Sequence, residues 1–127
     1  MSNKFNAKKI IFNGITFDSK KECERYKQLK ILESKGEITN LELQKKFVLI
    51  PKQEMEYDEN LKSGKIKTKR MTIEREISYV ADFYYKDKEG KEVVEDVKGC
   101  KFGAAYNIFV LKRKMMLYFY GIQIKEI

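Results

Sequence analysis

The segment from Met71 to Lys98 constrains the fold more than any other, because it reads as two strands joined by a turn of fixed length. The turn residues are Asp87-Lys88-Glu89-Gly90. A type I turn followed by a left-handed glycine gives a common three-residue hairpin, so Asp87 is expected to pair with Lys91. Counting back from that pair places Asp82 directly opposite Asp96.

The predicted register brings like charges together. Side chains alternate between the two faces of a strand, so Asp82, Asp96 and Lys98 are expected on one face and Glu95 on the other. Two directly opposed carboxylates, roughly 5 Å apart, repel each other and need a compensating cation. Lys98 supplies part of that charge, and a hard ion such as Mg²⁺, usually held by one or two carboxylates, would supply more. The alternative is a surface ion pair on an exposed hairpin face, which contributes little.

A third acid falls within the apolar stripe of the first predicted helix, which runs from about Asp18-Ser19 to Lys35. At about 100° per residue, Glu22 lies near the middle of that stripe. A buried acid is costly unless it is paired or bound to metal, which makes Glu22 a candidate ligand. The alternative is that Ser19 and Glu22 form a capping box and nothing more. The stripe consists of Cys23, Tyr26, Leu29 and Leu32.

The remaining patterns predict a mixed α/β chain with helices packed on a central sheet. The expected order is β-hairpin, helix, three strands, helix, strand, in one domain over residues 1–127. The charged segment at about 52–70 is either a flexible loop or the arm of a long hairpin. The predicted elements outside the first helix are Lys9–Phe12 and Ile15–Phe17 around Asn13-Gly14, Leu41–Ile50, Met71–Tyr85, Lys91–Lys98, Ala104–Tyr120 and Ile122–Ile127.

Composition bounds the chemistry. The chain has 127 residues, a net charge of +8 and no histidine, so catalysis would have to use carboxylates, lysine, tyrosine or cysteine. The basic balance favours a polyanionic partner, nucleic acid first, over a merely solvated basic surface. Two cysteines are too few for a disulfide framework, and we expect a cytoplasmic protein with no membrane span and no secretory signal.

Basic residues are concentrated in two segments of the chain. Residues 98 to 114 hold five Lys or Arg and no acid, which we interpret as a face for the DNA backbone, with a solvated helix face as the alternative. The charged segment at 52–70 is a second candidate contact with DNA, or ordinary loop charge. The candidate DNA-binding residues are Lys101, Lys112, Arg113, Lys114, Lys65, Lys67, Lys69 and Arg70.

Three short motifs, Ser19-x-x-Glu22, Ala81-Asp82-Phe83 and Glu95-Asp96-Val97-Lys98-Gly99, occur in this order along the chain. Together they resemble the PD-(D/E)xK nuclease superfamily, and more narrowly its small phage-associated, Holliday-junction-resolvase-like proteins. The resemblance extends from about Phe12 to Ile127 and includes Gln44 in the second strand region. Ala81 stands where the superfamily name has proline, at a position that varies widely.

The resemblance implies a restriction-endonuclease-like core and a metal-dependent DNA endonuclease, a phosphodiester hydrolase. Glu22, Asp82 and Asp96 would bind Mg²⁺ or Mn²⁺, together with the backbone carbonyl of Val97. Lys98 would orient the attacking water and stabilise the charge that grows on the phosphate.

The resemblance also implies branched or structured DNA as the substrate, a part in DNA recombination, a homodimer, and a phage or prophage origin within a bacterial cell. Lys112 would approach the scissile phosphate. Two alternatives stay open. One is a non-catalytic DNA- or protein-binding module that keeps the nuclease fold, and the other is a basic RNA-binding protein with a fortuitous acid cluster.

Overall fold

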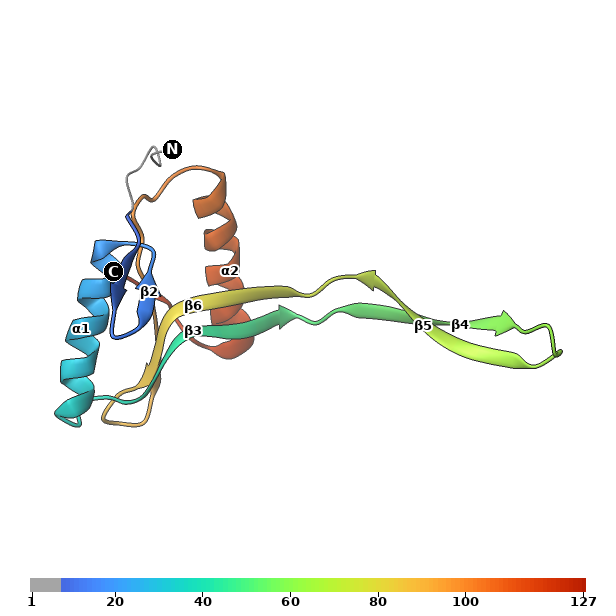
Figure 1. Ribbon diagram of the computed structural model, residues 1–127, viewed down its shortest axis with the longest axis horizontal. Helices are drawn as coiled ribbons and strands as arrows, with labels where there is room; N and C mark the ends of the chain where they lie inside the picture. The colour runs from blue at the N-terminus through green and yellow to red at the C-terminus, as the bar shows by residue number, and fades with distance from the viewer. Residues whose placement is uncertain (1–7) are drawn as a thin grey trace.

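The computed structural model describes residues 8–127, so residues 1–7 of the predicted domain lie outside the described part of the chain. The predicted mixed α/β class is confirmed: two helices flank a four-stranded sheet of order β3-β6-β7-β8, in which only β7 and β8 run parallel (Figure 1). The elements are β1 (Ile10–Phe12), β2 (Ile15–Phe17), α1 (Lys20–Ser34), β3 (Thr39–Ile50), β4 (Gln53–Asn60), β5 (Ile66–Glu74), β6 (Ile77–Lys86), β7 (Glu92–Asp96), α2 (Ala104–Tyr120) and β8 (Lys125–Glu126).

The sheet separates two apolar clusters, because α1 with the β1–β2 hairpin covers one face and α2 covers the other (Figure 1). β7 contributes to both clusters, with Val93 on the α1 side and Val94 on the α2 side. A strand whose two faces are both buried needs apolar residues at successive positions, which the pair Val93-Val94 provides. β7 therefore lies at the centre of the fold, and the acids that follow Val94 are held close to both cores.

β3 and β6 change faces part-way along their lengths. Leu43 and its partner Phe83 pack in the α1-side cluster, whereas Ala81, two residues before Phe83, packs in the α2-side cluster. The change of face falls between the pairs Leu43–Phe83 and Lys45–Ala81. The residues between these pairs are Gln44, whose φ is 53°, and Asp82. β6 therefore does not present one continuous face to either core, because the strand changes faces at Asp82.

Local signals set the ends of the helices. The side chain of Ser19 accepts a hydrogen bond of 3.1 Å from the Glu22 N–H, which confirms the predicted start of α1. α2 ends at Gly121, which adopts the left-handed conformation (φ 68°) that closes many helices. In the β1–β2 turn, Asn13 and Gly14 both have positive φ, as the predicted tight hairpin turn requires.

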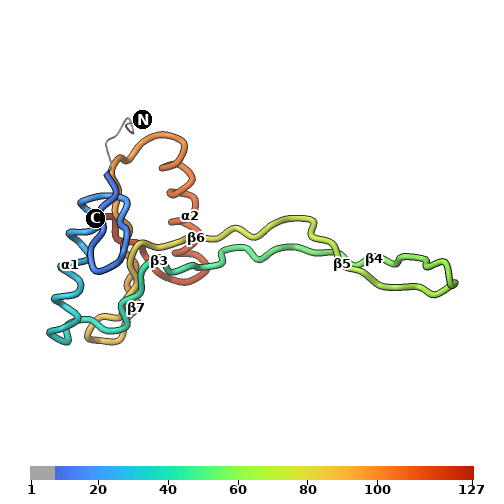
Figure 2. Tube along the Cα trace, viewed as in Figure 1, coloured from blue at the N-terminus to red at the C-terminus, as the bar shows by residue number. Residues whose placement is uncertain are grey.

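β4 and β5 form an arm that extends away from the rest of the chain (Figure 2). Within residues 8–127 they pair only with each other, as a separate two-stranded sheet. The single strand expected over Met71–Tyr85 is interrupted at Arg75-Glu76, because β5 pairs with β4 in the arm whereas β6 pairs with β3 in the central sheet. Of the two alternatives for the charged segment at about 52–70, a flexible loop or a hairpin arm, the structure shows the hairpin.

Candidate active site

The hairpin register that places the two aspartates is confirmed. Phe83 pairs with Glu95, and the Asp87 N–H donates to the Lys91 carbonyl at 2.9 Å. Continuing this register by one residue sets Asp82 opposite Asp96, at the point where β7 ends. Asp96 is buried and Asp82 is half-buried, so the two carboxyl groups meet away from bulk water.

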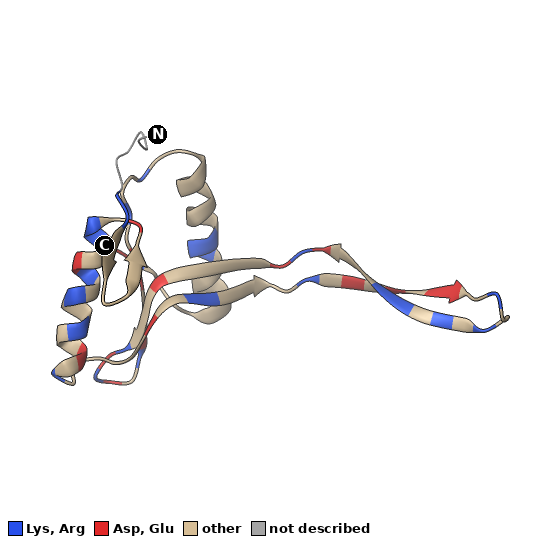
Figure 3. Cartoon of the chain, in the orientation of Figure 1, with Lys and Arg blue, Asp and Glu red and all other residues tan. Residues whose placement is uncertain are grey.

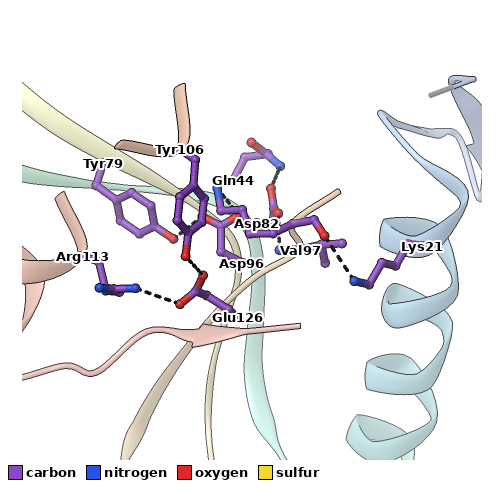
Figure 4. A network of polar contacts seen from close by, with 10 residues as sticks. Lys21, Gln44, Tyr79, Asp82, Asp96, Val97, Tyr106, Arg113 and Glu126 are labelled. Carbon is purple, nitrogen blue, oxygen red and sulfur yellow. Dashed lines mark hydrogen bonds and ion pairs between the residues drawn. The ribbon is translucent and has the colours of Figure 1, made fainter. Parts of the chain in front are cut away.

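Each aspartate has one oxygen that is firmly held and one that is not (Figure 4). The Val97 N–H donates to Asp82 Oδ2 at 2.8 Å, and the Tyr79 hydroxyl donates to Asp96 Oδ2 at 2.6 Å. The contacts of the two Oδ1 atoms are longer: Gln44 Nε2 lies 3.4 Å from that of Asp82, and Lys98 Nζ lies 3.4 Å from that of Asp96. The firm hydrogen bonds fix how the carboxylates point and leave one oxygen of each weakly engaged.

Two acids of the site, Asp82 and Glu22, have raised pKa values. Burial, followed by the neighbouring Asp96 carboxyl group, raises the pKa of Asp82 to about 7. Burial also raises the pKa of Glu22, and the charges of Asp18 and Asp96 raise it further. A shift of this kind marks negative charge that lacks a full counter-charge. Glu22 thus belongs to the same electrostatic site as the two aspartates.

Lys98 lies two residues after the end of β7, with its amine 3.4 Å from Asp96 Oδ1. Its Nζ is also 3.7 Å from the centre of the Phe109 ring, a cation–π contact that limits where the amine can go. The Lys98 carbonyl accepts a hydrogen bond of 3.2 Å from Lys21 Nζ of α1. An open hollow of about 460 Å³ adjoins this segment, lined by Val97, Lys98, Gly99, Cys100, Phe102, Ala105 and Tyr106.

The three predicted carboxylate ligands, Glu22, Asp82 and Asp96, do not all meet at one point. Within residues 8–127, no three His, Cys, Asp or Glu side chains are arranged closely enough to hold a metal ion by themselves. The two aspartates are opposed, and Glu22, buried in the first turn of α1, interacts with them through its charge. The chemistry of these side chains suits a hard cation such as Mg²⁺, because their donor atoms are carboxylate oxygens that carry negative charge. Ligands beyond the two aspartates would have to include water or substrate oxygens.

The structure adds residues that the sequence did not single out. Tyr79 binds Asp96 from β6, and burial together with this hydrogen bond raises the pKa of the tyrosine. Glu126 of β8 lies opposite Asp96 in the parallel β7–β8 pairing. Its carboxylate is held by the Tyr106 hydroxyl at 2.7 Å and by Arg113 Nη1 at 3.0 Å. No local pattern indicated these partners, because each comes from a distant strand or helix.

Glu95, adjacent to Asp96, belongs to a different network. Arg25 of α1 binds its two oxygens at 2.6 and 2.7 Å, and the Tyr85 hydroxyl donates to it as well. Glu95 is fully buried on the α1 side of the sheet, as expected from its alternation with Asp96. This bidentate pair satisfies the carboxylate, so Glu95 is a structural acid.

The candidate DNA-binding residues are spread over three parts of the chain. Lys101 and Lys114 are exposed, whereas Arg113 is engaged by Glu126. Lys112 lines a groove at the base of the arm together with Ile77 and Met115, so it lies beside the arm. The other four, Lys65, Lys67, Lys69 and Arg70, lie in β5 and the turn before it, across the arm from the acidic side chains of β4 (Figure 3). There Lys69 pairs with Glu59, and Arg70 pairs with Glu56 at 3.2 Å.

Comparison with known proteins assigns the chain to a sequence family. The sequence model of a family described as a protein of unknown function, DUF1064, matches residues 2–126. The chain belongs to the DUF1064 family. No curated protein and no solved structure matches this DUF1064 member. Among its described residues, 8–127, no helix is both long and apolar enough to cross a membrane.

Proposed function

We propose that this chain is a metal-dependent endonuclease that hydrolyses phosphodiester bonds in DNA. The observation that carries the proposal is the pair Asp82 and Asp96, opposed across two strands, each with one oxygen fixed and the other weakly engaged, by Gln44 for Asp82 and by Lys98 for Asp96. A module that only bound DNA would gain nothing from buried carboxylates facing phosphate, because like charges repel. Their charge is useful where a cation is to be bound.

Asp82 and Asp96 would hold Mg²⁺ or Mn²⁺, with Glu22 acting directly or through water and the Val97 carbonyl as a further donor. When bound, such an ion lowers the pKa of a bound water and polarises a phosphoryl oxygen. The raised pKa values of Asp82 and Glu22 support this assignment, since burial and the neighbouring carboxylates disfavour the charged forms that a bound cation would stabilise.

The chain's own residues would do the rest. Tyr79 and the Val97 N–H orient the aspartates, so that little reorganisation is needed when a cation binds. The Lys98 amine, kept between Asp96 and the Phe109 ring, lies where it can donate to a phosphate oxygen and stabilise charge that develops there. The hollow beside Lys98 leaves room for substrate to approach.

The arrangement of the sheet and helices is compatible with a nuclease-like fold. A mixed central sheet between two helices, with a glutamate on the first helix and both aspartates on adjacent strands, agrees with a restriction-endonuclease-like core. The resemblance of the motifs extends the proposal to branched or structured DNA, recombination and a phage or prophage origin in the bacterial cytoplasm. These extensions rest on the family likeness of the motifs alone.

A nicking assay tests the proposal. Supercoiled plasmid, linear duplex and a four-way junction would be incubated with the protein in Mg²⁺, Mn²⁺ or EDTA. We expect metal-dependent cutting by the wild type, with a loss of at least about 100-fold in Asp96→Asn and in Lys98→Ala. Asp58→Asn and Lys88→Ala, which replace exposed residues of the same types, should leave cutting unchanged.

The assay also decides the second candidate function, a binding module that keeps the nuclease fold. That candidate is favoured by the incomplete convergence of acids within residues 8–127. Tight DNA binding by the wild type, without cutting of any substrate in either metal, would support the module and reject the enzyme. Equal cutting by wild type and Asp96→Asn would reject the assignment of the site.

A further inference from the structure

The open hollow of about 460 Å³ beside Lys98 has mostly apolar walls. Among the described residues that line it, Lys98 alone is charged, and Val97, Phe102, Ala105 and Tyr106 provide most of the remaining side-chain surface. Its volume lies within the range of pockets that bind small organic groups. A hollow of this kind suits a flat, largely apolar group that is attached to an anion.

Two aromatic rings belong to the hollow, one fixed and one exposed. The Tyr106 hydroxyl donates to Glu126 at 2.7 Å, and the Tyr106 ring packs 5.7 Å from that of Phe109, so its position is fixed (Figure 4). Phe102 is 69% exposed and belongs to neither apolar cluster of residues 8–127. Any nucleobase can stack on such rings, because every base has a π-face.

The hollow adjoins the position proposed for the scissile phosphate. The Lys98 amine, which would donate to a phosphate oxygen, lies 3.7 Å from the centre of the Phe109 ring, and that ring is the neighbour of Tyr106. The amine and the aromatic wall therefore form one continuous row. Because a base is joined to its phosphate through a single sugar, a phosphate bound by Lys98 would place an adjacent base within reach of the hollow.

Positive charge surrounds the entrance of the hollow. Lys101 lies between the lining residues Cys100 and Phe102, and from Val97 to Tyr106 the chain has two lysines and no acid. Cations interleaved with aromatic rings are typical of surfaces that bind single-stranded nucleic acid, with phosphates on the cations and bases on the rings. A purely apolar occupant, such as a side chain of another protein, would not use these cations.

A base inside an ordinary duplex is not free to enter the hollow, since it is paired and stacked between its neighbours. Taking it out costs energy, and this cost is least where the base is mismatched or already single-stranded. A hollow that holds one base therefore favours DNA in which a nucleotide beside the scissile phosphate is unpaired.

We propose that the hollow binds an unpaired nucleobase of DNA next to the phosphate held by Lys98, with the base stacked on Phe102 and Tyr106. The inference rests on the proposed function in that it takes the site to bind DNA, but it does not require cutting. It defines the preferred DNA by an unpaired nucleotide and not by the number of duplex arms.

Fluorescence anisotropy of the full chain with three labelled duplexes tests the proposal, in EDTA so that metal-dependent cutting cannot occur. One duplex is fully paired, one has a single thymine bulge, and one has an abasic bulge, which keeps the backbone and removes the base. We expect the thymine bulge to bind about 10-fold more tightly than either of the other two, the range of one base–aromatic stacking contact.

Substitutions at the rim assign this preference to the hollow. Phe102→Ala should lose most of the ratio between the thymine and abasic bulges, whereas Phe102→Tyr, which keeps the ring, should retain it. Phe119→Ala is the matched control, because it removes another exposed phenylalanine of the chain, at the far end of α2, and should retain the ratio. Circular dichroism would verify that all three variants stay folded.

The outcomes separate this proposal from the proposed catalysis. Equal affinity of the wild type for the thymine and abasic bulges would overturn the proposal and favour a protein partner for the hollow. A ratio that Phe102→Ala leaves intact, or a wild type that binds none of the three duplexes, would overturn it as well. A preference for the thymine bulge that depends on Phe102, together with no cutting in the nicking assay, would support the hollow and reject the enzyme.

Discussion

At the scale of single residues, the two neighbouring acids Glu95 and Asp96 have different environments. Glu95 faces α1 and is neutralised by Arg25, whereas Asp96 faces the α2 side beside Asp82 and Lys98. One pair of successive residues thus supplies a structural ion pair on one face of the sheet and a candidate cation ligand on the other. The alternation of a strand is sufficient to produce this division.

The Glu95 pair leads to a stability prediction. Arg25→Met should lower the free energy of unfolding by about 3 kcal/mol at pH 7, because it leaves a fully buried carboxylate without its cation. Arg25→Met combined with Glu95→Leu should recover most of that loss. Urea denaturation measures both variants. A single-variant loss below about 0.5 kcal/mol, the range of ordinary surface changes, would contradict this view of Glu95.

The raised pKa of Asp82 predicts a pH dependence in EDTA. With a pKa of about 7 in the folded state and about 3.9 unfolded, folded Asp82 keeps a proton that the unfolded chain has lost. Its contribution to stability is complete below about pH 4 and is lost as the pH rises to about 7. Asp82→Asn should therefore gain stability relative to wild type between pH 5 and pH 8.

Denaturant unfolding of both proteins across that range, without metal, is the measurement. Added Mg²⁺ at pH 8 should stabilise the wild type by mass action and leave Asp82→Asn unchanged. A difference between the two proteins that stays constant with pH would show that Asp82 is not held in a charge-deficient environment.

At the scale of elements, the arm and the body are separable. β4 and β5 pair with no other described strand, so replacing residues 53–74 by an Asn-Gly turn should cost little stability, under about 1 kcal/mol. Thermal unfolding followed by circular dichroism would measure it. A truncated chain that fails to fold would mean that the arm supports the central sheet.

Elements with local signals could be predicted from sequence. Ser19 marks the start of α1, Gly121 marks the end of α2, and the turn before Lys91 sets the register of the Asp82–Asp96 pair, because caps and tight turns act over a few residues. The bend at Asp82 could not be foreseen, since it depends on which core each half of the strand meets. Tyr79 and Glu126 were missed for the same reason: their contacts with the site are made across the sheet.

At the scale of the whole molecule, charge and shape divide the chain into two parts. The body holds the candidate site and the entire net positive charge, whereas the arm, with acidic residues on β4 and basic residues mainly on β5, is neutral overall (Figure 3). The positive charge of the body agrees with the proposal that the body binds nucleic acid. The proposed role of the body depends on its opposed aspartates, Asp82 and Asp96, binding a divalent cation.

Titration of Mn²⁺ into the protein at pH 8, with free Mn²⁺ followed by electron paramagnetic resonance, tests that claim most directly. Wild type should deplete the free signal, and Asp58→Asn should behave in the same way. Asp82→Asn and Asp96→Asn should each reduce Mn²⁺ affinity by about 10-fold or more. Binding that is equal in all four proteins, or absent from the wild type at millimolar Mn²⁺, would contradict the account.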